Sequence, residues 1–399
     1  MSKKILAILL VALMALSAVA LASCNGTTTT ETKIKAGFIY LHDENSTYDK
    51  NFMNGAKEAC EALGIEYLER ANIPEGNECY ETALDLIDQG CTVIFADSFG
   101  HEDYMIKAAK EHPEVQFCHA TGTKAHTENL ANYHNAFAAI YEGRFLAGVA
   151  AGMKLQEMIN AGQFTAEEAK IGYVGAFTYA EVISGYTSFF LGVRSIVPTV
   201  TMEVQFTGSW YDEAAEKEAA QILISHDCKL ISQHADSMGA PSACETAGIP
   251  NVSYNGSTVA QCPNTFIVSS RIDWAPYYKY VFGQMKEGKA IDTDWTGTLA
   301  TGSVVLTDIN EKAAAAGTAE KIAEVRAALE AGTLNVFAAD TFTKDGAKLD
   351  SYMADVDTDP EYTPDKEVIE DGAFRESKYR SAPYFDIQID GITLLNVAF

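Results

Sequence analysis

The chain has 399 residues, with 55 acidic and 29 basic side chains, and its formal net charge is −26. Hydrophobic residues make up 47% of it, which is enough to build buried cores and excludes a wholly disordered chain. This acidic excess argues against non-specific binding to nucleic acids or anionic lipid, because such polyanions require a surplus of lysine and arginine.

The N-terminus predicts an export signal followed by a tether. Two lysines precede an apolar run at 5–22, and the run ends in Leu-Ala-Ser-Cys at 21–24, which resembles the bacterial lipobox. Residues 1–23 are then a lipoprotein signal peptide, and Cys24 carries the lipid. The threonine-rich residues 24–33 form a flexible tether at the extracellular face of the cell membrane. A retained membrane anchor is the alternative, because the run is about as long as a short membrane-spanning helix.

From residue 34 onward, short apolar runs alternate with helical patterns, and this alternation predicts a parallel α/β sheet. Strands are expected at 34–40, 65–68, 92–96 and 115–119, with helices at 48–63, 80–88 and 105–112. We assign these elements to an N-terminal lobe that covers 34–137 and regains a segment at about 274–300. Gly64 is expected to end the first of these helices as a C-cap.

The same alternation restarts after a long predicted crossover helix at about 141–158. Strands are expected at 170–174, 202–206, 229–232, 252–254 and 266–268, with helices at 181–193, 214–225 and 241–247. These elements predict a second lobe over 138–273, and a helix at 277–286 is expected to return to the first lobe. The predicted fold class is therefore α/β, with two doubly wound parallel-sheet lobes joined by crossover segments.

The C-terminal part, 301–399, shows less regular alternation. The sequence predicts strand material at 295–306, a helix at 313–331 and a final strand at 391–395. Between them, residues 350–380 are rich in Asp, Glu, Pro and Tyr without a clear period, and we expect an acidic, irregular surface excursion. The whole segment is expected to complete the two lobes.

No catalytic or metal-binding motif stands out. Phosphate-loop, dinucleotide, nucleophile-elbow and zinc-protease patterns do not occur, and the eight histidines lack metal-ligand spacing. We therefore expect no catalytic residue, no metal and no cofactor. An extracellular hydrolase that acts through paired cleft carboxylates stays open as an alternative, because the sequence does not fix their separation. Seven cysteines follow Cys24 without C-x-x-C spacing, and most are expected to be buried free thiols.

Aromatic side chains next to small polar or acidic residues follow most of the predicted strands. Ligands bind beyond the carboxyl ends of parallel strands, so these loops should meet in one cleft. Aromatic faces stack on planar rings, and carboxylates accept hydrogen bonds from ring N–H groups. The pattern predicts a site for a flat, nitrogen-rich ring, with the candidate ligand-binding residues Tyr48, Asp49, Ser98, Phe99, Tyr179, Trp210, Asp236 and Trp274. The alternative is that Tyr48, Trp210 and Trp274 only pack between the lobes.

These features together resemble the basic membrane lipoprotein (BMP, PnrA-like) family of ABC-transporter substrate-binding proteins. The resemblance covers about residues 33–306, and five motifs carry it: DSFG at 97–100, FCHATG at 117–122, IYEGRFLAG at 140–148, GSWYD at 208–212 and QHADS at 233–237. It implies a fold like that of type I periplasmic binding proteins. It also implies that Tyr48 and Trp210 sandwich a purine ring and that Asp236 accepts hydrogen bonds from it.

The resemblance further implies a small-molecule ligand, a purine base or nucleoside, and an ABC permease in the membrane as partner, with a monomeric chain and no nucleic acid. Asp273 and Trp274 stand where nucleoside-binding members have a lysine that holds the ribose, which favours a free base. Sugars are the alternative ligands, and a sensor lipoprotein is the alternative role.

Overall fold

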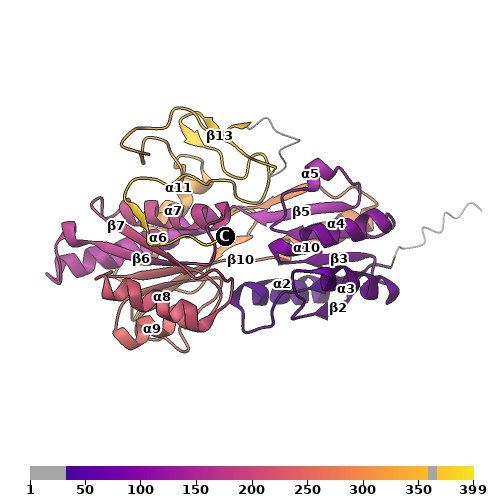
Figure 1. Cartoon of the computed structure of the whole chain (residues 1–399), viewed down its shortest axis with the longest axis horizontal. Coiled ribbons are helices and arrows are strands. Elements are labelled where there is room, and N and C mark those ends of the chain that lie inside the picture. The colour runs from indigo at the N-terminus through magenta and orange to yellow at the C-terminus, as the bar shows by residue number, and fades with distance from the viewer. Residues whose placement is uncertain (1–32, 358–365) are drawn as a thin grey trace, which may run out of the picture. The chain divides into compact units, whose positions relative to one another are not determined.

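The computed structural model describes residues 33–357 and 366–399, and Ile34–Phe399 form one compact unit (Figure 1). The predicted signal peptide, Cys24 and all of the predicted tether except Lys33 lie outside the described residues. Within the described ranges, no helix has the length and apolar character needed to cross a membrane.

The first sheet has six parallel strands in the order β11-β5-β4-β3-β1-β2. The strands are β1 (Lys35–Ile39), β2 (Glu66–Arg70), β3 (Val93–Ala96), β4 (Gln116–Ala120), β5 (Tyr133–Ala138) and β11 (Asp294–Gly297). The helices of this lobe are α2 (Thr47–Leu63), α3 (Asn77–Asp88), α4 (Glu102–Glu111), α5 (Ala125–Glu128) and α10 (Ala275–Glu287). Helices cover both faces of this sheet, so a central strand such as β3 is buried at all four positions. All four of its residues are accordingly apolar.

The second sheet has seven strands in the order β12-β10-β9-β8-β6-β7-β17, and only the β12 edge is antiparallel. Its strands are β6 (Lys170–Gly175), β7 (Thr201–Phe206), β8 (Ile231–His234), β9 (Asn251–Tyr254), β10 (Phe266–Ile272), β12 (Val304–Leu306) and β17 (Ile392–Leu394). Its helices are α6 (Ile140–Asn160), α7 (Ala180–Arg194), α8 (Glu213–Ser225), α9 (Gly239–Ala247) and α11 (Thr318–Glu330).

The two sheets repeat one strand order. The run β2-β1-β3-β4-β5 in the first corresponds to β7-β6-β8-β9-β10 in the second. The order reverses between β1 and β3 and between β6 and β8, and the loops beyond these strands are where open α/β sheets bind ligands. The predicted fold class, two doubly wound parallel-sheet lobes, is confirmed.

Three crossovers connect the lobes, after β5, after β10 and between β11 and β12. The first leads into α6, which packs on α7. The two helices are so close that a Cβ added at Gly148 would lie only 2.1 Å from the Phe189 carbonyl oxygen. The second leads into α10, which packs on α2, and the Tyr278 ring lies 5.1 Å from Phe38 in the core of the first lobe. The predicted return of this helix to the first lobe is therefore correct.

Local chemistry explains the boundaries of α2. The side chain of Ser46 accepts a hydrogen bond from the Asp49 N–H and caps the N-terminus, while Gly64 ends the helix with φ 64°. The C-cap expected from the sequence is thus present. All seven cysteines after Cys24 are buried and have free thiols, as expected.

Three sequence expectations need correction. Strand β5 was not expected, because polar residues interrupt its apolar run. In the structure these polar side chains are buried and have hydrogen-bond partners; Asn135 Oδ1, for example, accepts from the Ala125 N–H at 2.7 Å. The strand material at 295–306 divides into β11 and β12, which belong to different sheets.

The third correction concerns the acidic region at 350–380, whose described parts, 350–357 and 366–380, are more ordered than an irregular excursion. It contains β13 (Met353–Ala354), β14 (Lys366–Glu367), β15 (Ile369–Glu370) and β16 (Ala373–Phe374), paired as two small antiparallel sheets. Phe374 packs there against Phe385, whose ring stacks on Phe337 at 4.3 Å. Two-residue strands are too short to show a period in the sequence.

Candidate functional site

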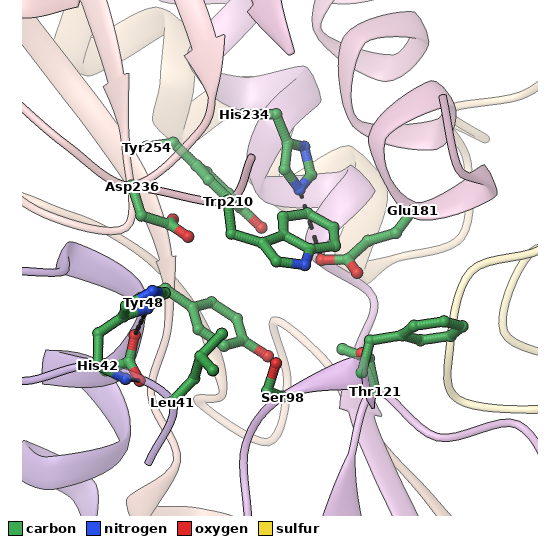
Figure 2. Close-up of a pocket in the computed structure, with 12 residues that line it drawn as sticks. Leu41, His42, Tyr48, Ser98, Thr121, Glu181, Trp210, His234, Asp236 and Tyr254 are labelled. Atoms are coloured by element: carbon green, nitrogen blue, oxygen red, sulfur yellow. Dashed lines mark hydrogen bonds and ion pairs between the residues drawn. The ribbon is translucent and has the colours of Figure 1, made fainter. Parts of the chain in front are cut away.

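A cavity opens between the carboxyl ends of the two sheets (Figure 2). Its volume is about 400 Å³, including the part open to solvent. The first lobe contributes Leu41, His42, Tyr48, Asp49, Ser98, Phe99 and Thr121, and the second contributes Glu181, Trp210, His234, Asp236 and Tyr254. We call this space the interlobe cavity.

Two aromatic side chains from different lobes lie on either side of the interlobe cavity. Tyr48 comes from the first turn of α2, and Trp210 comes from the loop between β7 and α8; Figure 2 shows the two rings across the cavity from each other. The Tyr48 hydroxyl donates to the Asp97 carbonyl oxygen at 2.8 Å, and Phe177 supports Trp210 edge-on at 5.1 Å. Both rings are therefore held in place at the edge of the cavity.

Asp236 is a candidate hydrogen-bonding residue of the cavity wall. Its carboxyl is buried, and its Oδ1 accepts from Asn255 Nδ2 at 3.2 Å. Burial, together with the neighbouring carboxyls of Asp49 and Glu216, raises the pKa of Asp236 well above its usual range. A ligand N–H directed at this carboxyl would stabilise its charged form.

Two further carboxyls near Tyr48, those of Asp49 and Asp97, differ in how many hydrogen bonds they accept from the protein. Asp49 accepts from the His42 N–H at 2.8 Å and from the Ser46 hydroxyl at 2.5 Å. Burial acts to raise the pKa of Asp49, but the hydrogen bonds from His42 and Ser46 hold it below its usual value. Asp97 accepts from the Leu41 N–H at 3.1 Å, and its Oδ2 has no partner among the described residues. Asp49 therefore holds the loop that contains His42 and Ser46 in place. That Asp49 also contacts the ligand remains a prediction.

Hydrogen bonds connect the site loops of the second lobe to each other and to the first lobe. The Asp236 N–H donates to the Trp210 carbonyl oxygen at 3.0 Å, so the stacking ring and the acceptor are positioned together. Across the cleft, the Thr47 N–H donates to the Asp236 carbonyl oxygen at 3.2 Å, and Asn51 Nδ2 donates to the Asn255 carbonyl oxygen at 2.9 Å. The lobes are thus in contact beside the cavity.

Six residues that line the cavity were not selected from the sequence: Leu41, His42, Thr121, Glu181, His234 and Tyr254. His234 Nε2 lies 3.4 Å from Glu181 Oε1, while the Tyr254 hydroxyl is buried and lacks a hydrogen-bond partner within the described part of the chain. Tyr254 ends β9 and His234 ends β8, so the rule about strand carboxyl ends could have found both. Because Tyr254 lines the cavity and its hydroxyl has no partner among the described residues, it is a candidate ligand contact.

The structure brings together six of the eight candidate residues at the interlobe cavity: Tyr48, Asp49, Ser98, Phe99, Trp210 and Asp236. Tyr179 lies beside it, stacked on Phe177 at 5.1 Å and 5.7 Å from the Phe99 ring. The assignment of Trp274 to the site is wrong in this structure. Its side chain is buried in the first lobe and stacks on Phe52 at 4.2 Å, because the start of α10 directs it into the core.

The buried carboxyl of Glu216 makes a pH-dependent contribution to stability. It accepts from the Ser237 N–H at 3.2 Å beside Asp236, and burial raises its pKa from 4.5 to about 7. Folding therefore takes up a proton between these values, so this contribution is complete below about pH 4.5 and is lost as the pH rises through about 7. We expect Glu216→Gln to gain thermal stability relative to the unsubstituted protein as the buffer changes from about pH 5 to about pH 8.

Thermal unfolding curves across this pH range measure that difference. Glu218→Gln, which alters an exposed residue of the same helix, is the matched control and should show a constant difference. A Glu216→Gln difference that does not change with pH would contradict the assigned protonation.

A family model described as ABC transporter substrate-binding protein, PnrA-like, matches residues 39–330. The chain belongs to this family. A protein of the family binds a small-molecule ligand and works with a membrane permease. The family expected from the sequence is thus confirmed, and the match ends before the last 69 residues of the chain.

Individual relatives agree with the family assignment. A purine-binding protein of Brucella abortus is 33% identical over 253 residues, which are 62% of this chain and 67% of the relative. A putative ABC transporter glucose-binding protein of Haloferax volcanii is 34% identical over 206 residues, which are 51% of this chain but only 49% of the relative. Among solved structures, an ABC transporter solute-binding protein of Aeropyrum pernix superposes with a TM-score of 0.63 at 16% identity, covering 76% of this chain and 93% of that one. This last likeness shows the fold.

Proposed function

We propose that this protein is the lipid-anchored substrate-binding component of an ABC importer and that it binds a purine base or nucleoside in the interlobe cavity. The observation that carries the proposal is the pair of aromatic side chains, Tyr48 and Trp210, on either side of a cavity that the Asp236 carboxyl also lines. A planar ring between the two faces would be stacked on both sides, and its N–H groups would meet the carboxyl.

Stacking and hydrogen bonding have different parts in this site. Base–aromatic stacking is sequence-tolerant and contributes about 1–3 kcal/mol per base, so Tyr48 and Trp210 would bind any purine. Selection would come from Asp236 and the Tyr254 hydroxyl, because a ring that offers no donor leaves the buried carboxyl with only its hydrogen bond from Asn255.

Binding would favour the closed arrangement of the lobes. The two stacking residues come from different lobes, so the ligand is fully held only when the cleft is closed. The crossovers after β5 and β10 and between β11 and β12 are the segments that connect the lobes and would act as the hinge. The closed form is then what the permease recognises.

The remaining parts of the proposal concern location and assembly. The lipobox at 21–24 supports lipidation of Cys24 and attachment at the extracellular face of the cell membrane. We propose that the protein acts as a monomer and releases its ligand unchanged. Mass spectrometry of a purine recovered after incubation tests the last point, and a hydrolysed product would favour the enzyme alternative.

Replacing Asp236 is expected to change the ranking of ligands. In Asp236→Asn the side chain keeps its shape but loses the charge that accepts ring N–H donors. We expect the ratio of the hypoxanthine and adenine dissociation constants to change by about tenfold, because hydrogen bonds to charged groups contribute about 1.5–3 kcal/mol. Calorimetric titration measures both constants.

The control for this substitution is Asp88→Asn, which removes an exposed carboxyl at the end of α3 and should leave the ratio unchanged. If Asp236→Asn shifted both constants by the same factor, Asp236 would not select between the bases.

A sugar is the second candidate ligand, because one relative is named as a putative glucose-binding protein. Aromatic faces and carboxylates also occur at sugar sites, so the class of ligand needs a direct binding comparison.

A further inference from the structure

Two buried asparagines connect the lobes outside the interlobe cavity. Asn51 lies on α2 of the first lobe, one turn after Tyr48, and Asn255 directly follows β9 of the second lobe. Only 6% of Asn51 and 2% of Asn255 are exposed. Both line a groove of about 1280 Å³, including the part open to solvent, and none of the described residues lines both this groove and the interlobe cavity. The two asparagines therefore lie outside the space proposed for the ligand.

A chain of hydrogen bonds runs from α2 through these asparagines to the Asp236 carboxyl. Asn51 Nδ2 donates to the Asn255 carbonyl oxygen at 2.9 Å, across the cleft between the lobes. Asn255 Nδ2 in turn donates to Asp236 Oδ1 at 3.2 Å. Within the described part of the chain, this is the one hydrogen bond that the Asp236 carboxyl accepts. Asn255 is therefore the residue that can fix the orientation of this carboxyl.

The backbone of Asn255 is itself held in a defined conformation. Its φ is 61°, in the left-handed region that asparagine adopts more readily than most residues. Its N–H donates to the Ser270 carbonyl oxygen on β10 at 2.9 Å. Asn255 is thus bonded at once to the second sheet, to the first lobe through Asn51, and to Asp236.

The two lobes also approach each other closely next to this chain of bonds. The Thr47 hydroxyl of α2 donates to the Asp236 carbonyl oxygen at 3.2 Å. A Cβ added at Gly256 would lie only 3.1 Å from Thr47 Cγ2. Such bonds join residues of different lobes, so they exist only when the lobes are together.

We propose that Asn255 is a positioning residue that determines ligand specificity without touching the ligand: it orients the Asp236 carboxyl, and Asn51 of the first lobe holds Asn255 when the lobes close. This inference rests on the proposed binding of a purine ring in the interlobe cavity. Selection between rings is then strongest in the closed arrangement, because the bond from Asn51 exists only there.

The charges around Asp236 explain why this carboxyl needs a fixed donor. Burial, together with the carboxyls of Asp49 and Glu216, raises the pKa of Asp236 well above its usual range, and the bond from Asn255 acts in the opposite direction. The amide thus favours the charged form, which is the form that accepts ring N–H donors. Without Asn255, the carboxyl would turn more freely and keep its proton to a higher pH.

Replacing Asn255 with glycine tests the positioning role. This change removes the amide but keeps the backbone, because glycine adopts a φ of 61° without strain. We expect the ratio of the hypoxanthine and adenine dissociation constants to change by about three- to tenfold, in the same direction as in Asp236→Asn. Calorimetric titration measures both constants. Asn129→Gly, at an exposed asparagine with φ 52°, is the matched control and should leave the ratio unchanged.

Replacing Asn51 with alanine tests the link to the first lobe. Alanine is the best helix former, so α2 stays intact and the test does not depend on the glycine variant. We expect the same ratio to change by at least about twofold, in the direction seen in Asn255→Gly, because Asn255 has lost the bond that holds it. Asn54→Ala, at an exposed asparagine of α2 that lines the same groove, should leave the ratio unchanged.

The double variant separates this link from a simple contact between lobes. With glycine at 255 there is no amide to orient, so adding Asn51→Ala should not change the ratio any further. A contact that only holds the lobes together would instead weaken both purines by one factor, because it changes the population of the closed form alone.

Three results would overturn this inference while leaving purine binding intact: an unchanged ratio in Asn255→Gly, equal weakening of both purines in Asn51→Ala, or a further change of the ratio in the double variant. Wild-type protein that binds neither hypoxanthine nor adenine would refute the proposed function itself, and the positioning role with it. The two failures are therefore distinguishable.

Discussion

Replacing Trp210 with alanine is expected to weaken the binding of every purine by about 10- to 100-fold, because the loss of one stacked face costs about 1–3 kcal/mol. The indole lies across the cavity from Tyr48 and is supported by Phe177, so its removal leaves the ring stacked on one side only. Calorimetric titration with adenine and hypoxanthine measures the loss. Unlike Asp236→Asn, this change should leave the ranking of the two bases intact.

Two controls define this result. Trp210→Phe keeps an aromatic face and should recover most of the affinity. Trp295→Ala removes a half-buried indole that packs on Tyr277, away from the cavity, and should not change binding. Purine affinity that survives Trp210→Ala unchanged would exclude the two-sided stacking arrangement.

Replacing Arg144 with alanine is expected to lower the free energy of unfolding by about 3–5 kcal/mol, because it leaves buried acceptors unpaired and opens a cavity. The guanidinium is fully buried and donates to the Tyr173 hydroxyl at 3.0 Å and to Ser232 Oγ at 2.8 Å. It also lies over the ring of Tyr254, 5.1 Å from its centroid, and so supports one wall of the interlobe cavity. Arg144 thereby connects α6, the crossover helix, to three strands of the second sheet.

Urea unfolding followed by tryptophan fluorescence measures this loss. The matched control is Arg326→Ala on α11, where a surface ion pair with Glu330 should contribute less than about 1 kcal/mol. An Arg144→Ala loss no larger than that of the control would show that the hydrogen bonds seen at Arg144 contribute little.

Most of the fold could be predicted because its two sheets are parallel and covered on both faces. Such strands are short apolar runs, as in β3, and the helices between them begin and end at recognisable caps such as Ser46 and Gly64. Strand β5 escaped prediction because its buried His134 and Asn135 find partners only in the folded chain. The four strands in the acidic region at 350–380 escaped because they have two residues each, and tertiary contacts rather than local period define them.

The site was predictable to the extent that it follows the carboxyl ends of strands. Tyr48, Trp210 and Asp236 were found in this way, and all three line the interlobe cavity. Trp274 was misplaced because a sequence does not show whether the start of a helix directs its side chain to a cleft or to a core. The position of Tyr384 close to Phe99 and Trp210 could not be foreseen, since it depends on how residues 366–399 pack on the lobes.

The account depends on a purine ring in the interlobe cavity, and one calorimetric comparison tests this most directly. The purified protein is titrated with adenine, hypoxanthine and D-glucose under the same conditions. We expect saturable binding of at least one purine at one site per chain and no binding of glucose. Binding of glucose without binding of either purine would contradict the account and favour the sugar alternative.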